Sequence, residues 1–186
     1  MNLLNNLAPE NKTSLDQLTE SLIEKYSREI PTFKNSIVES PMFNLANEYS
    51  YHFINVPLLL RLALLDLCVL FKYYLNSKSE IDTNLFARLI CGQLYEFTED
   101  VPIMFGKKYR KLILQVPEAK MLTEDLNFLL KEFNDRKGKY APNLKKIRHN
   151  IAHHKDIDGV FQANLMEELD LNFVTYAYLD LTHWLN

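Results

Sequence analysis

The chain has 186 residues, of which 47% are hydrophobic, and it carries a formal net charge of −3 with a sequence pI of about 6.0. This length fits one domain, whose apolar core can form without a disulfide or a structural metal. The slightly acidic balance argues against a broad basic surface of the kind that coats nucleic acid, but it leaves room for a small basic pocket.

Helical periodicity extends along nearly the whole sequence, which has only four glycines. We therefore predict an all-α helical bundle, with a flexible segment over residues 1–12 and a single domain over residues 13–186. In chain order, the expected helices are Thr13 or Ser14 to Glu29, Met42–Phe53, Pro57–Asn76, Asn84–Asp100 with Asp82 or Thr83 as its cap, Phe105–Leu114, Thr123–Asp135, a helix that begins at Pro142, and Gln162–Trp184.

Prolines define several of these expected helix ends. Pro31 should end the first helix, and Pro102 should break or kink the helix that precedes it, because proline lacks the backbone N–H of a helix interior. Pro57 and Pro142 suit first turns, where that N–H has no helical partner. A basic turn over residues 136–139 should precede the helix at Pro142.

The most apolar stretch is Val56–Leu75, which is about long enough to span a bilayer. Arg61 and Asp66 interrupt it, and either charge at mid-membrane would cost about 2.5 kcal/mol or more. We therefore interpret this stretch as the central buried helix of the bundle. Each of the two charges should then meet a partner on another element.

Two further features indicate a cytoplasmic protein. The first residues lack the basic segment and long apolar core of a secretory signal. Cys68 and Cys91 lie inside apolar helical stretches, so we expect both to be reduced core residues.

The densest run of chemically versatile side chains lies near the C-terminal end, over residues 148–154. Its polar members are Arg148, His149, Asn150, His153 and His154. The other two histidines, His52 and His183, are expected to be packed or surface residues. Arginine binds phosphate oxygens through a planar fork, and histidine can accept and donate a proton near neutral pH. Cleavage of RNA without a metal needs both abilities.

Helix geometry constrains how this pair could act. Arg148 and His153 are five residues apart, so on an ideal α-helix they point about 140° away from each other. Both could reach one phosphate only if the helix ends between them or a second protomer faces the first.

The segment 148–153 resembles the signature of HEPN domains, in which an arginine and a polar residue are followed by a histidine after four to six intervening positions. Four residues separate Arg148 from His153, and His154 fits the spacing with five. The surrounding residues are similar to those of prokaryotic abortive-infection proteins. The resemblance covers the motif closely and the helical pattern loosely. It implies a HEPN-like helical bundle that forms a homodimer with both motifs in one cleft.

The resemblance also implies an activity and a setting. Many members of the family are metal-independent endoribonucleases, in toxin, abortive-infection or stress-response systems. RNA would then be the substrate, an antitoxin a candidate partner, and no cofactor would be needed. In that mechanism the RNA 2′-hydroxyl attacks the adjacent phosphate, Arg148 binds that phosphate, and His153 serves as general base or acid.

Four further residues receive supporting roles from the resemblance. His149 would orient the arginine or the phosphate, while Asn150 and His154 would hold RNA or support the catalytic histidine. Some HEPN proteins place an acidic residue of a neighbouring helix against the motif arginine, and Glu96 is the candidate here.

Three other interpretations of the motif remain open. The segment could be only a charged helix end on a solvated face. It could be a metal site built from His149, His153 and His154 with Asp156 or Asp158, although the glutamate that usually accompanies such histidines is absent. It could also belong to a non-catalytic helical module that binds RNA, a nucleotide or a partner protein.

Overall fold

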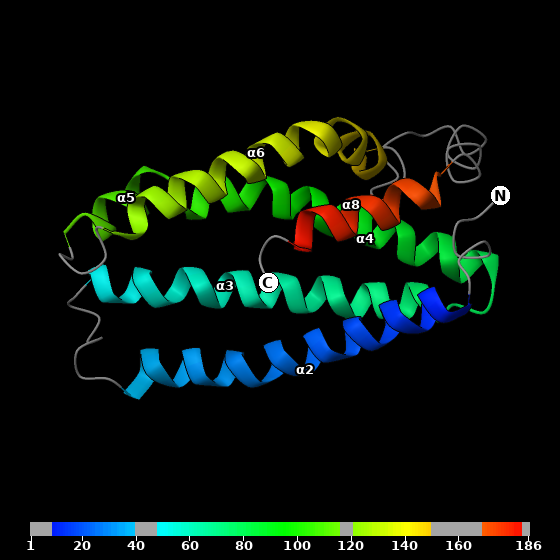
Figure 1. The fold of residues 1–186 in the computed structure, drawn as a ribbon, viewed down its shortest axis with the longest axis horizontal. Helices are drawn as coiled ribbons and strands as arrows, with labels where there is room; N and C mark the ends of the chain where they lie inside the picture. Colours follow the sequence, from blue (N-terminus) through cyan, green and yellow to red (C-terminus); the bar gives the residue numbers. More distant parts are fainter. Residues whose placement is uncertain (1–8, 40–47, 116–120, 150–168, 184–186) are drawn as a thin grey trace.

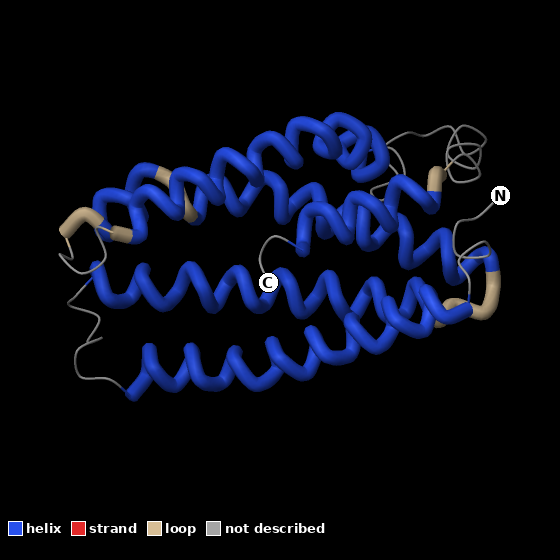
Figure 2. Tube along the Cα trace, viewed as in Figure 1, coloured by secondary structure: helices blue, strands red, loops and turns tan. Residues whose placement is uncertain are grey.

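The computed structural model describes residues 9–39, 48–115, 121–149 and 169–183. These residues form helices and no strand, so the predicted all-α helical bundle is confirmed (Figure 2). The helices are α2 (Pro9–Glu39), α3 (Glu48–Leu75), α4 (Glu80–Met104), α5 (Lys107–Ile113), α6 (Leu122–Ile147) and α8 (Leu171–His183).

The long helices pack side by side and alternate in direction along the chain (Figure 1). α3 lies between α2 and α4, and α4 in turn contacts α6 and α8. α2 and α6 therefore lie at opposite edges of the bundle. The short helix α5 closes one end, where it contacts α3 and α6.

One apolar core joins α2, α3, α4, α6 and α8. Its largest fully buried side chains include Tyr26, Phe71, Tyr74, Leu94, Phe133 and Leu181. Phe71 of α3 stacks on Tyr178 of α8 with ring centroids 3.8 Å apart, and Phe97 of α4 meets the Phe133 ring of α6 edge-on. Helices of this length depend on such packing because isolated helices are only marginally stable in water.

Both cysteines are free and buried, as predicted. Burial raises the pKa of the Cys91 thiol to about 12. It also raises the pKa of Cys68, against the effect of its hydrogen bond with Tyr178. Neither thiol is therefore poised to react as a thiolate near neutral pH.

The apolar helix α3 occupies the middle of the bundle, between α2 and α4. Its residues Tyr51–Leu75 satisfy the length and composition of a membrane span, and 28% of their most apolar stretch is buried by the other helices. The core helix of a soluble protein passes the same test. Arg61 has the predicted ion-pair partner, Glu29 of α2. The prediction for Asp66 is wrong, because its side chain is exposed and no described residue pairs with it.

The predicted helix ends at prolines are wrong in three places, because Pro31, Pro57 and Pro142 lie inside helices. Pro102 also lies inside a helix, α4, which ends two residues later at Met104. A proline in a helix interior removes one hydrogen bond and costs about 3 kcal/mol. Buried side chains lie on both sides of two of these prolines: Val56 and Leu60 around Pro57, and Tyr140 and Leu144 around Pro142. At these two sites, packing of both flanks against the core offsets the lost bond.

The predicted basic turn over residues 136–139 is also helical, and it forms a clamp between α6 and α8. Arg136 pairs with the Asp180 carboxylate, the Tyr140 hydroxyl donates to it at 2.9 Å, and the Lys139 ammonium lies 3.3 Å from it. Three side chains from two successive turns of α6 thus converge on one carboxylate of α8. Their spacing requires the helix to continue through Gly138, where a turn was predicted.

Other helix starts also differ from the prediction. α2 begins at Pro9 rather than at Thr13 or Ser14, so residues 9–12 lie in a helix where a flexible segment was predicted. α4 begins earlier than expected, because Ser79 caps it by accepting a 3.1 Å hydrogen bond from the backbone N–H of Asp82. α8 begins at Leu171, because Leu169 and Asp170 are not helical, so the predicted uninterrupted helix Gln162–Trp184 is wrong at these two residues. The predicted start at Gln162 lies outside the described residues.

Replacement of Pro31 by alanine should stabilise the protein. Alanine would supply the missing N–H of α2, and the gain should exceed the greater freedom of the unfolded chain, for a net increase of about 2 kcal/mol in the free energy of unfolding. Urea denaturation of wild type and variant measures this change. The exposed substitution Lys34→Ala, on the same helix, serves as the control and should have an effect within about 0.5 kcal/mol. A less stable Pro31→Ala protein would contradict the account.

The clamp at Asp180 should make stability depend on pH below the ordinary range of a carboxyl group. Burial raises the pKa of Asp180, but hydrogen bonds from Tyr140 and Lys139 and the charge of Arg136 outweigh it, so the pKa lies below its ordinary value of 3.8. The ionised carboxylate therefore stabilises the fold above pH 3.8, and this contribution is lost as pH falls through the lower, folded-state pKa.

Asp180→Asn tests the clamp. The variant should be less stable than wild type at about pH 6, where the carboxylate is ionised, and this difference should shrink as the pH falls below 3.8. Thermal unfolding from neutral to acidic pH measures it. A difference that stays constant across this range would mean that the charge of Asp180 contributes nothing.

Candidate functional site

The motif begins where α6 ends. Arg148 follows Ile147, the last residue of α6, and keeps helical backbone angles, with φ −57° and ψ −47°. At Arg148 and His149 the winding widens from an α-helix to a π-helical turn. Such wide turns are rare and occur frequently at functional sites.

The guanidinium of Arg148 is held by a carboxylate of α4. Its Nε donates to Oε1 of Glu96 at 2.5 Å, and its Nη2 contacts the same oxygen. The side chains are 23% and 45% exposed, so the pair lies at the surface end of the α4–α6 contact. Glu96 was the acidic residue expected from the family resemblance to lie against Arg148, and the two side chains are in contact.

An aromatic ring completes the support of the arginine. Tyr95, the neighbour of Glu96 on α4, places its ring centroid 5.2 Å from the guanidinium carbon of Arg148. Cations within about 6 Å of a ring centroid are attracted to the face of the ring. The His149 ring meets the same tyrosine edge-on, with centroids 6.4 Å apart. Arg148 and His149 therefore both contact the ring of Tyr95.

The surroundings of the site carry several charges. Lys145 and Lys146 lie exposed in the last turn of α6. Further back along α6, Lys137 pairs with Glu99 of α4 at 2.8 Å. The end of α6 therefore presents cationic side chains toward solvent, whereas the α4 side supplies the compensating carboxylates.

Three predicted site residues, Asn150, His153 and His154, lie outside the described residues. Of the proposed zinc ligands the structure describes only His149, and within the described ranges no three histidine, cysteine or acidic side chains cluster in a way that could hold a metal ion. His52 lies near the start of α3, where its ring meets that of Tyr51 edge-on.

Comparison of the chain with family models, with curated proteins and with solved structures finds no match in any of the three. The geometry of the described residues therefore carries the functional argument.

Sequence reasoning did not assign a role to Tyr95. The position of Tyr95 next to Glu96 could have indicated its role. Two consecutive residues of a helix can both contact a side chain that approaches from a neighbouring helix. It also missed a groove between α2 and α3 that contains Arg61, far from the motif.

The Arg148–Glu96 contact should be measurable as a coupling energy. A double-mutant cycle with Glu96→Ala and Arg148→Ala should give a favourable coupling of about 0.5–1 kcal/mol in urea denaturation, because both side chains are partly exposed. The coupling should weaken at about 1 M salt. A coupling indistinguishable from zero at low salt would show that the contact does not hold the arginine in solution.

Proposed function

We propose that this protein is a metal-independent endoribonuclease of the HEPN type, active as a homodimer. The proposal rests on one observation: an arginine at the predicted motif position is held at the end of α6 by Glu96 and Tyr95. A guanidinium that is fixed before the substrate arrives stabilises developing negative charge without reorganisation.

The remaining hydrogen-bond donors of Arg148 favour a phosphate ligand. Glu96 occupies Nε and Nη2, and among the described residues none accepts a hydrogen bond from Nη1. Nη1 carries two N–H groups that can donate to phosphate oxygens. Glu96 thus fixes the plane of the guanidinium while one edge stays open to the scissile phosphate.

The wide turn at Arg148 bears on the spacing of the motif. In an α-helix, residues five apart diverge by about 140°, whereas π-helical hydrogen bonds join residues five apart. The two side chains of an Arg-x4-His pair on one chain can face the same side only with such wider winding. The π-helical turn begins at Arg148. The alternative source of the histidine is the second protomer of a dimer.

In the proposed reaction, His153 removes the proton of the RNA 2′-hydroxyl, and the resulting oxygen attacks the adjacent phosphorus. The bond from phosphorus to the 5′-oxygen breaks, and that oxygen takes a proton from a histidine. The products are a 2′,3′-cyclic phosphate and a 5′-hydroxyl. Arg148 stabilises the charge on the phosphoryl oxygens, and His149, Asn150 and His154 support the pair. A cytoplasmic location and control by an antitoxin belong to the same proposal.

The test is cleavage of defined RNA by purified protein in EDTA. Wild type should produce 2′,3′-cyclic phosphate and 5′-hydroxyl ends and leave the matching DNA intact. Arg148→Ala should lower kcat about 10²–10³-fold, the cost of removing one donor to a charged transition state. His153→Ala should lower it about 10²–10⁴-fold through loss of acid–base catalysis.

Two controls sharpen the result. Lys137→Ala removes a cation of the same helix that is also paired with a carboxylate of α4 but lies outside the Asp180 clamp, and activity per folded molecule should survive. His154→Ala decides which histidine completes the motif. Equal cleavage by wild type and the Arg148→Ala/His153→Ala double variant would refute the proposal. RNA binding without cleavage would favour the non-catalytic module, and cleavage only with added metal would favour the metal site.

A further inference from the structure

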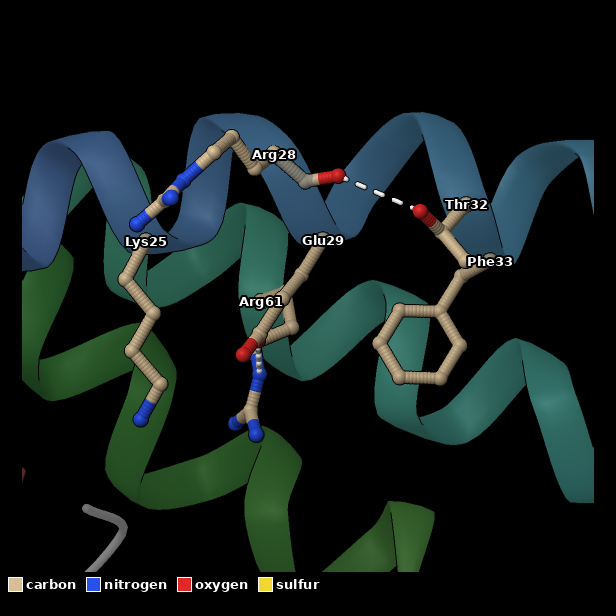
Figure 3. Close-up of a pocket in the computed structure, with 6 residues that line it drawn as sticks. All are labelled: Lys25, Arg28, Glu29, Thr32, Phe33 and Arg61. Carbon is tan, nitrogen blue, oxygen red and sulfur yellow. Dashed lines mark hydrogen bonds and ion pairs between the residues drawn. The ribbon is translucent and has the colours of Figure 1, made fainter.

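A second candidate site lies at the opposite edge of the bundle from the motif, in a groove between α2 and α3. The α2–α3 groove has a volume of about 430 Å³ (Figure 3). This is within the range of about 300–1,000 Å³ that small-molecule sites occupy. Its lining side chains are Lys25, Arg28, Glu29, Thr32, Phe33 and Arg61.

The α2 side of the groove is one face of a helix. Lys25, Glu29 and Phe33 follow one another at four-residue intervals and therefore lie in a row. Arg28 and Thr32 flank that row at the same interval. At 1.5 Å per residue the row extends about 12 Å from the ammonium end to the aromatic end.

The groove holds more positive than negative charge, in a chain whose net charge is −3. Three cations and one carboxylate line it, and that carboxylate, Glu29, is already paired with Arg61 at 2.5 Å. Among the described residues, Lys25 and Arg28 have no carboxylate within salt-bridge distance. The Lys25 ammonium lies 5.8 Å from the centroid of the Tyr26 ring, and Nε of Arg28 donates to the Glu24 carbonyl oxygen at 3.4 Å.

Two of the three cations share one aromatic ring. The ammonium of Lys25 and the guanidinium carbon of Arg61 lie 5.8 Å and 5.4 Å from the centroid of Tyr26, which is buried. The ring attracts each cation, so both charges lie beside the same aromatic side chain. Together with Arg28 they exceed the single carboxylate of the groove, so its lining favours a ligand with more than one negative charge.

The other end of the groove is aromatic. Phe33 is half-buried and projects on the far side of the Glu29–Arg61 pair from Lys25 (Figure 3). A base can stack on such a ring whatever its identity. A single inorganic ion cannot touch both the cationic end and Phe33, but a phosphate ester that carries an aromatic base can.

We propose that the α2–α3 groove binds a nucleotide, with its phosphates between Lys25, Arg28 and Arg61 and its base against Phe33. The nucleotide is either a free nucleoside diphosphate or one unit of an RNA strand, because both present the same chemistry. No residue of the 148–154 motif lines the groove. The proposal therefore stands independently of the nuclease activity.

Calorimetric titration of the full chain tests the groove. The probes are ADP, GDP, CDP and UDP, with pyrophosphate as a ligand that lacks a base and a six-nucleotide RNA as the strand. Lys25→Ala/Arg28→Ala should weaken binding of the diphosphates about tenfold or more, because two charged donors to phosphate are lost. Phe33→Ala should weaken binding of the nucleotides about fivefold or more and leave pyrophosphate unchanged.

A charge-matched control is available on the same helix. Lys12→Ala/Lys34→Ala removes the same charge from α2 outside the groove and should change affinity less than about twofold, because screening weakens distant charges. Binding of the diphosphates identifies a free nucleotide as the ligand. Binding of the RNA alone, with the same loss in the groove variant, identifies the strand.

Three results would overturn the proposal: no binding of either probe class by wild type, an equal loss in the groove and control variants, or nucleotide binding that survives Phe33→Ala in full. None of them bears on the nuclease, which is measured by cleavage and depends on Arg148. Conversely, an inactive motif leaves the groove titrations unaffected.

Discussion

Phe71 of α3 and Tyr178 of α8 stack face to face inside a core to which α2, α4 and α6 also contribute. The other features of the bundle follow from burial of these side chains. Burying a large apolar side chain contributes about 1.5–3 kcal/mol, whereas an interior proline costs about 3 kcal/mol. Buried residues on both sides of Pro57 and of Pro142 therefore offset the cost of the proline, and each helix continues.

The same burial positions the candidate site. α4 and α6 meet through Phe97 and Phe133 in the core, and 15 residues further along the chain Arg148 reaches Glu96 of α4. The ion pair contributes little to the stability of the fold, since both side chains are partly exposed. Its effect is to orient the guanidinium, so the core determines where the arginine lies and the pair determines which way it points.

The sequence predicted correctly those features that depend mainly on the type of one residue or on the spacing of apolar residues. Apolar periodicity predicted helices throughout and two buried cysteines, and both predictions are confirmed. A charged residue inside an apolar helix correctly predicted a partner for Arg61. The same rule failed for Asp66, because periodicity gives the buried face of a helix only approximately, and Asp66 lies outside it.

Helix ends and the α2–α3 groove were beyond sequence reasoning for a different reason. Whether a proline ends a helix depends on how much apolar surface its flanks bury, and that depends on the packing of distant segments. The groove likewise joins α2 to Arg61 of α3, which is 28 residues beyond Phe33. The contact of Glu96 with Arg148 was expected from a resemblance and is present. The catalytic roles of the motif stay a prediction.

The contacts with Asp180 fix α6 against α8 at one point, so a tilt of α6 about that point moves the end of the helix. Tyr140, the last of the three side chains that contact the carboxylate, lies eight residues before Arg148, which is about 12 Å along the helix axis. A tilt of about 5° around this pivot would move the guanidinium by about 1 Å, a displacement large enough to lower the rate of a positioned reaction by about two orders of magnitude. A partner that presses on α8 could therefore change activity at the end of α6 without touching the motif.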